Sequence, residues 1–290
     1  MRNIIICLLM ALPLSAMGQG IIKHDTRAIV KPKTAQAKKS TGAPQNPVAK
    51  LLKDMVHVQG GTYTMGATAE QGSDAYEWEY PTHRVTVSSF YICKYEVTQA
   101  LWKAIMGGKN PSCWPGDKRP VECVSWTAIQ TFIQRLNART GKHFRLPTEE
   151  EWEWAARGGD RSRGYKYSGS NDCTKVAWHY HNSKSSLRTY NVGTKLPNEL
   201  GLYDMSGNVR EIVSNAYLSY KDTPRALVAN SSDQVTIRGG HFWDNDRLCR
   251  VSYRTDMHQE SVAQQYTGFR LAASSLCRGA FVTPEGHFIH

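Results

Sequence analysis

The segment from Pro197 to Glu211, PNELGLYDMSGNVRE, restricts the fold and chemistry of this chain more than any other. It combines turn-forming residues with oxygen-bearing side chains at a spacing that one hard cation can use. Calcium takes about six to eight oxygen ligands from carboxylates and backbone carbonyls. A tight turn at Gly207 lets successive carbonyls converge between Asp204 and Glu211. The segment therefore predicts either a calcium-binding turn or two acidic residues that cap turns.

Three further motifs accompany this segment. Arg145–Glu153, with the sequence RLPTEEEWE, precedes it, and Arg238-Gly239-Gly240 and Gly268-Phe269-Arg270 follow it. With these motifs in this order the chain resembles the sulfatase-modifying-factor family, whose founder is the formylglycine-generating enzyme. The resemblance extends over residues 55–273. It implies one α+β domain with a modified C-type-lectin-like fold and much irregular structure.

The resemblance also implies a metal site. In that family, two side chains and two backbone carbonyls hold a structural calcium ion. The matching positions here are Asp204, Gly207, Val209 and Glu211, and each keeps the required chemistry. A second calcium region of the family matches residues 175–193, which contain no Asp or Glu, so we expect that second site to be lost.

The activity implied by the resemblance needs two thiols. The family's oxidase holds copper(I), a soft ion, between two cysteines that lie five positions apart after the Gly-Gly pair. Counted without gaps, these positions fall on Asp244 and Cys249, and an alignment anchored on Arg250–Arg254 leaves Cys249 outside the pair as well. We therefore expect that the protein does not bind copper. Cys249 would be a catalytic residue only if the protein were an oxidase. A remote cysteine such as Cys173 or Cys277 beside Cys249 would restore the pair.

Other positions around the family's groove have changed too. The family's serine after Gly-Gly is replaced here by His241. The aromatic residues that flank the glutamate of the family's calcium turn are replaced by Arg210 and Ile212. We expect a rebuilt cleft that contains His241, Trp243, Asp244 and Cys249.

Two interpretations of this cleft stay open. His241, Asp244 and Asp246 form either a new metal or acid–base cluster, or ordinary hydrogen-bonded loop residues.

These features favour a binding protein over an oxidase. The first hypothesis is a non-oxidase protein that holds a peptide or protein partner or assembles a component of the cell envelope. The alternative is a formylglycine-generating oxidase that acts on a sulfatase cysteine, or a divergent oxidase on the same fold. Carbohydrate binding is a third hypothesis, and it depends on the fold alone.

The first 50 residues differ in composition from the rest. A basic start, the apolar run Ile4–Leu14 and the small residues before Gln19 predict a signal peptide over residues 1–18, without a lipoprotein cysteine. The apolar run is too short to span a bilayer. Residues 19–50 predict a disordered basic arm, which carries most of the net charge of +11. We expect a periplasmic or secreted protein that has no transmembrane helix and does not bind nucleic acid, with its folded domain over residues 51–290.

Six of the seven cysteines lie beyond the predicted signal peptide. Because an exported chain meets an oxidising compartment, we expect at least one disulfide, with the pairing open and Cys249 unpaired if the cleft is open. These cysteines are Cys93, Cys113, Cys123, Cys173, Cys249 and Cys277.

Local patterns predict one hairpin and three helices. Residues 55–58 and 62–65 alternate around a Gly turn, which is typical of a β-hairpin. Apolar residues at helical spacing predict helices over 96–106 and from Ser125 to Gly141. A capping box formed by Thr148 and Glu151 predicts a short third helix that ends near residue 156.

Overall fold

The computed structural model describes residues 46–183, 186–221, 233–274, 281–282 and 288–289. The predicted signal peptide and residues 19–45 of the predicted arm lie outside these ranges, as does Cys277. The α-helices are α1 (Pro47–Lys53), α2 (Gln99–Met106), α3 (Trp126–Thr140), α4 (Glu149–Ala156), α5 (Cys173–Val176) and α6 (Tyr180–Ser183). The strands are β1 (Met55–Val58), β2 (Gly61–Met65), β3 (His83–Val87), β4 (Phe90–Cys93), β5 (Phe144–Arg145), β6 (Arg210–Ala216), β7 (Gln234–Arg238), β8 (Arg254–His258), β9 (Thr267–Gly268), β10 (Ala272–Ser274), β11 (Phe281–Val282) and β12 (Phe288–Ile289). Short 3₁₀ turns are η1 (Ala69–Asp74), η2 (Glu77–Glu79), η3 (Gly159–Arg161), η5 (Asp246–Cys249) and η6 (Gln259–Ser261).

The three predicted helices are confirmed by their caps. Ser125 accepts the amide of Ala128 at the start of α3, and Gly141 ends that helix in a left-handed conformation. At α4, the Thr148 hydroxyl accepts the Glu151 amide at 3.1 Å, and the Glu151 carboxylate accepts the Thr148 amide at 2.9 Å. Helix α2 begins three residues later than predicted, because Thr98 is its N-cap.

The predicted hairpin of β1 and β2 is wrong. β1 pairs with β4 and β2 pairs with β3, and one antiparallel register runs through both pairs, from Met55 opposite Cys93 to Met65 opposite His83. The two runs are thus one long strand that bends at Gly60. A Cβ atom at Gly60 would lie 2.4 Å from the carbonyl oxygen of Val87, so glycine is needed for close approach rather than for a reversal of the chain.

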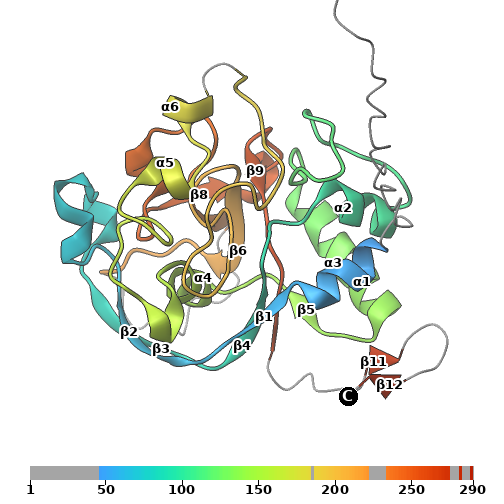
Figure 1. Cartoon of the computed structure of the whole chain (residues 1–290), viewed down its shortest axis with the longest axis horizontal. Helices are drawn as coiled ribbons and strands as arrows, with labels where there is room; N and C mark the ends of the chain where they lie inside the picture. Colours follow the sequence, from blue (N-terminus) through green and yellow to red (C-terminus); the bar gives the residue numbers. More distant parts are fainter. Residues whose placement is uncertain (1–45, 184–185, 222–232, 275–280, 283–287, 290) are drawn as a thin grey trace, which may run out of the picture. The chain divides into compact units, whose positions relative to one another are not determined.

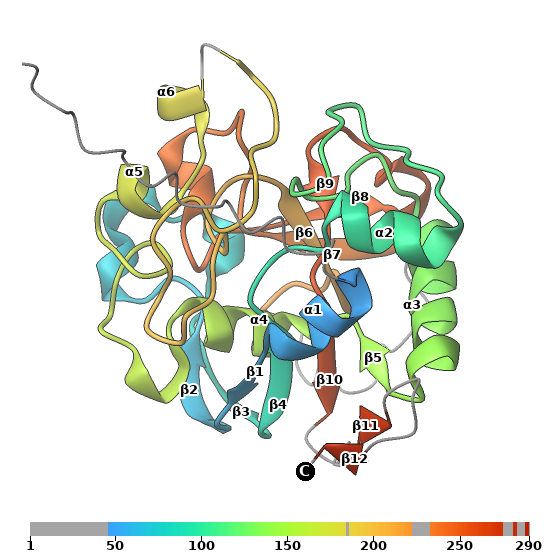
Figure 2. The ribbon, with the colours of Figure 1, turned by 45° about the vertical axis from the view of Figure 1, so that its right-hand side comes forward.

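Two four-stranded sheets form the centre of the domain. One has the strand order β1-β4-β10-β5 and the other the order β8-β7-β6-β9, in which β6 and β9 are parallel. Figures 1 and 2 show α1, α2 and α3 grouped on one side of the second sheet, with α5, α6 and their long loops on the other. Helix α4 packs against β2, β3 and β6. This mixed architecture confirms the predicted α+β class.

Helix α1 begins at Pro47, with Asn46 as its N-cap, so the predicted domain boundary at residue 51 falls inside a helix. Its buried residues Val48 and Leu51 belong to the same apolar cluster as α2 and α3. Among the described residues, no helix has the length and hydropathy to cross a membrane.

Among the residues that the structure describes, four arginines are fully buried, and each is paired with a buried glutamate. The pairs are Arg238–Glu153, Arg250–Glu79, Arg254–Glu149 and Arg270–Glu211. We call this set the ion-pair core. Burying a charge costs several kcal/mol unless its partner and hydrogen bonds compensate. The backbone carbonyls of Ser252 and Tyr253 complete the shell of Arg238 at 2.8 and 2.7 Å.

The sequence motifs converge on this core. Glu149 and Glu153 come from α4, Glu211 from β6, Arg238 from the end of β7, and Arg270 from the segment after β9. The motif residues are therefore largely structural, because they hold the two sheets and α4 together.

Candidate functional site

The turn from Asp204 to Glu211 joins the irregular half of the chain to β6. Asp204, Gly207 and Asn208 all have positive φ, at 57°, 81° and 62°. Gly207 is required there, because a Cβ atom would lie 2.3 Å from the carbonyl oxygen of Trp178. The amide of Asn208 donates to that carbonyl at 2.9 Å. The predicted tight turn therefore exists, and it is packed directly on the segment before α6.

Three buried carboxylates gather around this turn: Glu96, Asp204 and Glu211. Glu96 accepts the amide of Val209 at 3.1 Å and the side-chain amide of Asn208 at 2.7 Å. Burial, followed by the charges of Asp204 and Glu211, raises the pKa of Glu96 well above its usual range. Glu96 was missed in the sequence, where it lies outside every motif.

Glu211 is already occupied by protein donors. Its two oxygens accept bonds of 2.6 Å each from Arg270, and Oε2 also accepts the indole N–H of Trp152 at 2.8 Å. Arg270 therefore neutralises Glu211, whereas Asp204 and Glu96 accept hydrogen bonds from uncharged groups.

Asp204 is the residue at this turn that best suits a cation. Its Oδ2 accepts the Gly193 amide at 2.7 Å, whereas its buried Oδ1 has no hydrogen-bond partner in the described part of the chain. Burial raises the pKa of Asp204 to about 6. An unpartnered buried oxygen on a carboxylate costs free energy that a bound cation would recover.

Three of the predicted cleft residues, His241, Trp243 and Asp244, lie in a hydrogen-bonded loop after β7. Asp244 is buried and pairs with Arg210 through contacts of 2.9 and 3.1 Å, and it also accepts the His241 amide at 3.1 Å. Burial raises the pKa of Asp244 despite the neighbouring guanidinium. Asp246 is exposed and bonds the amide of the next residue, Arg247. These contacts favour the hydrogen-bonded-loop interpretation over a three-residue cluster.

His241 is neutral in this arrangement. Its Nδ1 accepts the Trp243 amide at 3.0 Å, so its proton lies on Nε2, 3.3 Å from Asp244. Burial, followed by the charge of Arg210, lowers the pKa of His241 to about 2. Its ring stacks on Tyr266 with centroids 4.3 Å apart.

Two aromatic side chains stand exposed beside this loop. Trp243 is 47% exposed and Tyr180 is 39% exposed. The amide of Tyr180 donates to the carbonyl of Asp244 at 2.8 Å, which places the start of α6 against the same loop. We call Trp243 and Tyr180 the aromatic surface. Of the four predicted cleft residues, Trp243 is the one that solvent reaches freely.

Cys249 does have a second thiol beside it. Cys173, at the start of α5, is the neighbour that most affects the Cys249 thiol, and both belong to an apolar cluster with Tyr167, Val176 and Ala177. Cys249 is fully buried and Cys173 nearly so. The neighbouring Cys173 thiol, followed by burial, raises the pKa of the Cys249 thiol well above its usual range. The structure thus brings a remote cysteine to Cys249, but in an apolar interior.

Comparison with known proteins decides the family. The family model described as "Sulfatase-modifying factor enzyme 1-like domain" matches residues 39–275. The chain belongs to this family. Its relatives include "Chaperone protein LppX" of Paenibacillus barcinonensis, 35% identical over 69% of this chain and 82% of the relative. The formylglycine-generating enzyme of Thermomonospora curvata is 26% identical over 80% of this chain and 97% of that enzyme.

Solved structures agree with this assignment. "Treponema denticola variable protein 1" superposes with a TM-score of 0.64 and 29% identity, covering 76% of this chain and 94% of its own. The family predicted from four sequence motifs is confirmed, and with it the fold of the sulfatase-modifying-factor domain. Within that fold, this member places an ion pair of Asp244 and Arg210 where a gap-free count puts the first copper thiol.

Proposed function

We propose that this chain is a non-oxidase member of the sulfatase-modifying-factor family that is exported and holds a peptide or protein partner at the aromatic surface. The observation that carries the proposal is the burial of Cys249. A copper(I) oxidase needs thiolates that the metal and a substrate cysteine can reach. Here the sulfur is enclosed in an apolar cluster, and its raised pKa disfavours the thiolate.

The exposed aromatics support a binding role. Large aromatic side chains contribute much of the energy at protein interfaces. Arg210, whose pair with Asp244 leaves it partly exposed, lies close to Tyr266, with its guanidinium 5.4 Å from the ring centroid. A cation beside aromatic rings suits a polypeptide that carries an acidic or aromatic residue. The relative from Paenibacillus is called a chaperone, which agrees with a protein partner.

We expect no conversion of a sulfatase-type cysteine by this protein. The purified chain, supplied with copper(I), a C-x-P-x-R peptide, oxygen and a thiol reductant, should leave the peptide unchanged by mass spectrometry. A formylglycine-generating enzyme treated in parallel is the positive control. Formylglycine that is formed by the wild type and lost in Cys249→Ser would establish the oxidase alternative instead.

We expect a partner to contact Trp243. A photo-crosslinking amino acid at position 243 should give a discrete protein adduct in the producing cells. The matched control is the same amino acid at Tyr80, which is exposed to a similar degree, 42%, before β3. Equal adducts at both positions, or none at position 243, would contradict binding at the aromatic surface.

We also propose that a calcium ion binds at the turn from Asp204 to Glu211. The unpartnered Oδ1 of Asp204 fits a hard cation, and the carbonyls of Gly207 and Val209 are the backbone ligands that the family pattern implies. Glu211 fits less well, because Arg270 and Trp152 occupy its oxygens. Asp204 is therefore the residue whose loss should remove the ion.

A further inference from the structure

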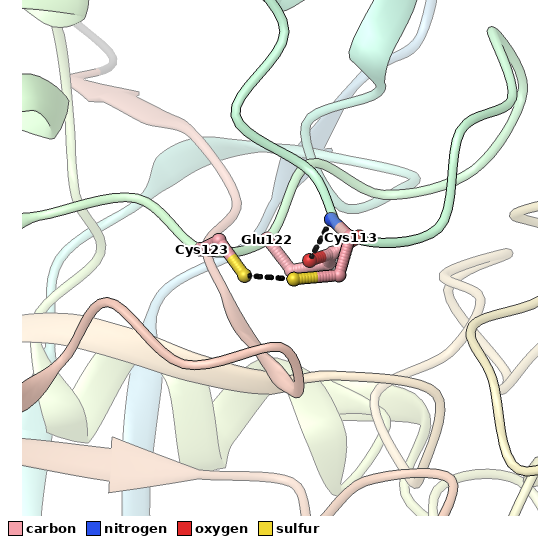
Figure 3. A group of neighbouring side chains, drawn as sticks. All are labelled: Cys113, Glu122 and Cys123. Carbon is pink, nitrogen blue, oxygen red and sulfur yellow. Dashed lines mark hydrogen bonds between the residues drawn. The ribbon is translucent and has the colours of Figure 1, made fainter.

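The loop that joins α2 to α3 brings two cysteines together, away from the site described above. Cys113 is exposed and Cys123 is half-buried, and their sulfur atoms lie 2.8 Å apart. Glu122 lies beside them, and one ligand atom from each of the three residues falls within 4.8 Å of the others. Figure 3 shows the two sulfurs facing each other, with the Glu122 carboxylate turned toward the backbone of Cys113.

The loop holds its shape through hydrogen bonds that involve neither sulfur. The side-chain amide of Gln99 donates to the carbonyls of Trp114 and Pro120 at 2.9 and 3.1 Å. The Glu122 carboxylate accepts the amides of Cys113 and Trp114 at 2.9 and 3.0 Å. The two sulfurs are thus placed by the loop itself, so little conformational entropy is lost when they bond.

The geometry favours a sulfur–sulfur bond over a metal site. Two thiolates about 2.3 Å from one tetrahedral zinc ion would place their sulfurs about 3.8 Å apart. A disulfide bond is about 2.05 Å long. The sulfurs here, 2.8 Å apart, are too close for two ligands of one zinc ion. Each oxygen of Glu122 also accepts a backbone amide already.

We propose that Cys113 and Cys123 form a disulfide by exchange with an external disulfide, and that Cys113 reacts first. The Cys113 thiolate attacks one sulfur of the external R–S–S–R, which forms a mixed disulfide and releases one thiolate. The Cys123 thiolate then attacks Cys113 Sγ and releases the second. The two cysteines lose two protons and two electrons, and the external disulfide becomes two thiols.

The order of attack follows from the surroundings of the two thiols. Cys113 is exposed, so a reagent in solution reaches it. Burial, then Cys113 and Glu122, raise the pKa of the Cys123 thiol. Such a thiol reacts slowly with a reagent from solution, but it has a neighbouring sulfur within 2.8 Å. Cys123 is therefore the resolving cysteine.

The bond would also anchor the loop to the candidate site. Cys123 has a left-handed backbone, with φ of 59°, and its amide donates to the carbonyl of Gln264 at 3.0 Å. Two residues further on, Tyr266 stacks on His241. A disulfide would thus tie Cys113 to a residue whose backbone is hydrogen-bonded to the segment that supports the predicted cleft.

Peptide mapping tests the bond directly. The full chain is purified without reductant, its free thiols are alkylated under denaturing conditions with a chelator, and it is digested with trypsin. Cleavage after Lys118 separates Cys113 from Cys123. We expect the two peptides, residues 110–118 and 119–135, to be linked until reduction. Recovery of both cysteines in alkylated form, or linkage of either to another cysteine, would overturn the proposal.

Trapping tests the order of attack. Reduced protein is mixed with glutathione disulfide, and bound glutathione is mapped by mass. Cys123→Ser should hold one glutathione on Cys113, whereas Cys113→Ser should acquire it at Cys123 roughly tenfold more slowly. Cys173→Ser, which removes a buried thiol, is the matched control and should still form the Cys113–Cys123 bond. Equal rates in the two variants would disprove the assigned order.

Discussion

Replacing Glu153 by alanine should lower the free energy of unfolding by about 3–5 kcal/mol. Glu153 is fully buried, pairs with Arg238, accepts the Arg157 side chain at 2.9 Å, and also accepts the Gly66 amide at 2.9 Å. Its loss leaves the buried Arg238 to the carboxylate of Glu149, 3.9 Å away, which already pairs with Arg254. A domain is stable by about 5–15 kcal/mol in total, so this change removes a large share of the stability.

The midpoint and the slope of a urea denaturation curve give the free energy of unfolding of each variant. The matched control is Asp117→Ala, which breaks the ion pair with Lys103 at the surface, where the Asp117 side chain is 68% exposed. That variant should lose about 0.2–1 kcal/mol. If Glu153→Ala and Asp117→Ala lose the same small amount, the ion-pair core does not stabilise the domain. Adding Arg238→Met to Glu153→Ala should recover part of the loss, because it removes the buried charge that has lost its close partner.

Local signals predicted the helices well. The caps at Ser125 and Thr148 act over three residues, and the structure has both. The hairpin was mispredicted because alternation and a Gly pair describe a bent strand as well as a turn. The choice depends on whether β1 pairs with β2 or with β4, some 35 residues away, and sequence spacing does not encode that partner.

The sequence predicted where the turn from Asp204 to Glu211 lies, but not which groups its carboxylates contact. The motif that contains Asp204 and Gly207 does form a tight turn with positive φ at both residues. Arg270 occupies the oxygens of Glu211, and Glu96 joins the turn. Both contacts depend on packing between segments that are distant in the sequence. The approach of Cys173 to Cys249, across 76 positions of sequence, is likewise a property of the fold.

Chelation should lower the melting temperature if a calcium ion binds at Asp204. A ligand that binds only the folded state adds about 2.7 kcal/mol at a hundredfold excess over Kd. For a domain of this size that corresponds to roughly 5–10 °C. Asp204→Ala should melt at the same temperature with and without chelator, since it removes the unpartnered oxygen that suits the ion.

The choice of variant matters, because Glu211→Ala would destabilise the domain with or without calcium. It would leave Arg270 buried without a carboxylate, so its melting temperature cannot report on the ion. Asp160→Ala, which removes an exposed carboxylate in η3, is the better comparison and should keep the full response to chelator. Elemental analysis establishes that the starting protein contains calcium. Identical melting curves for that protein before and after chelation would show that calcium does not stabilise the fold.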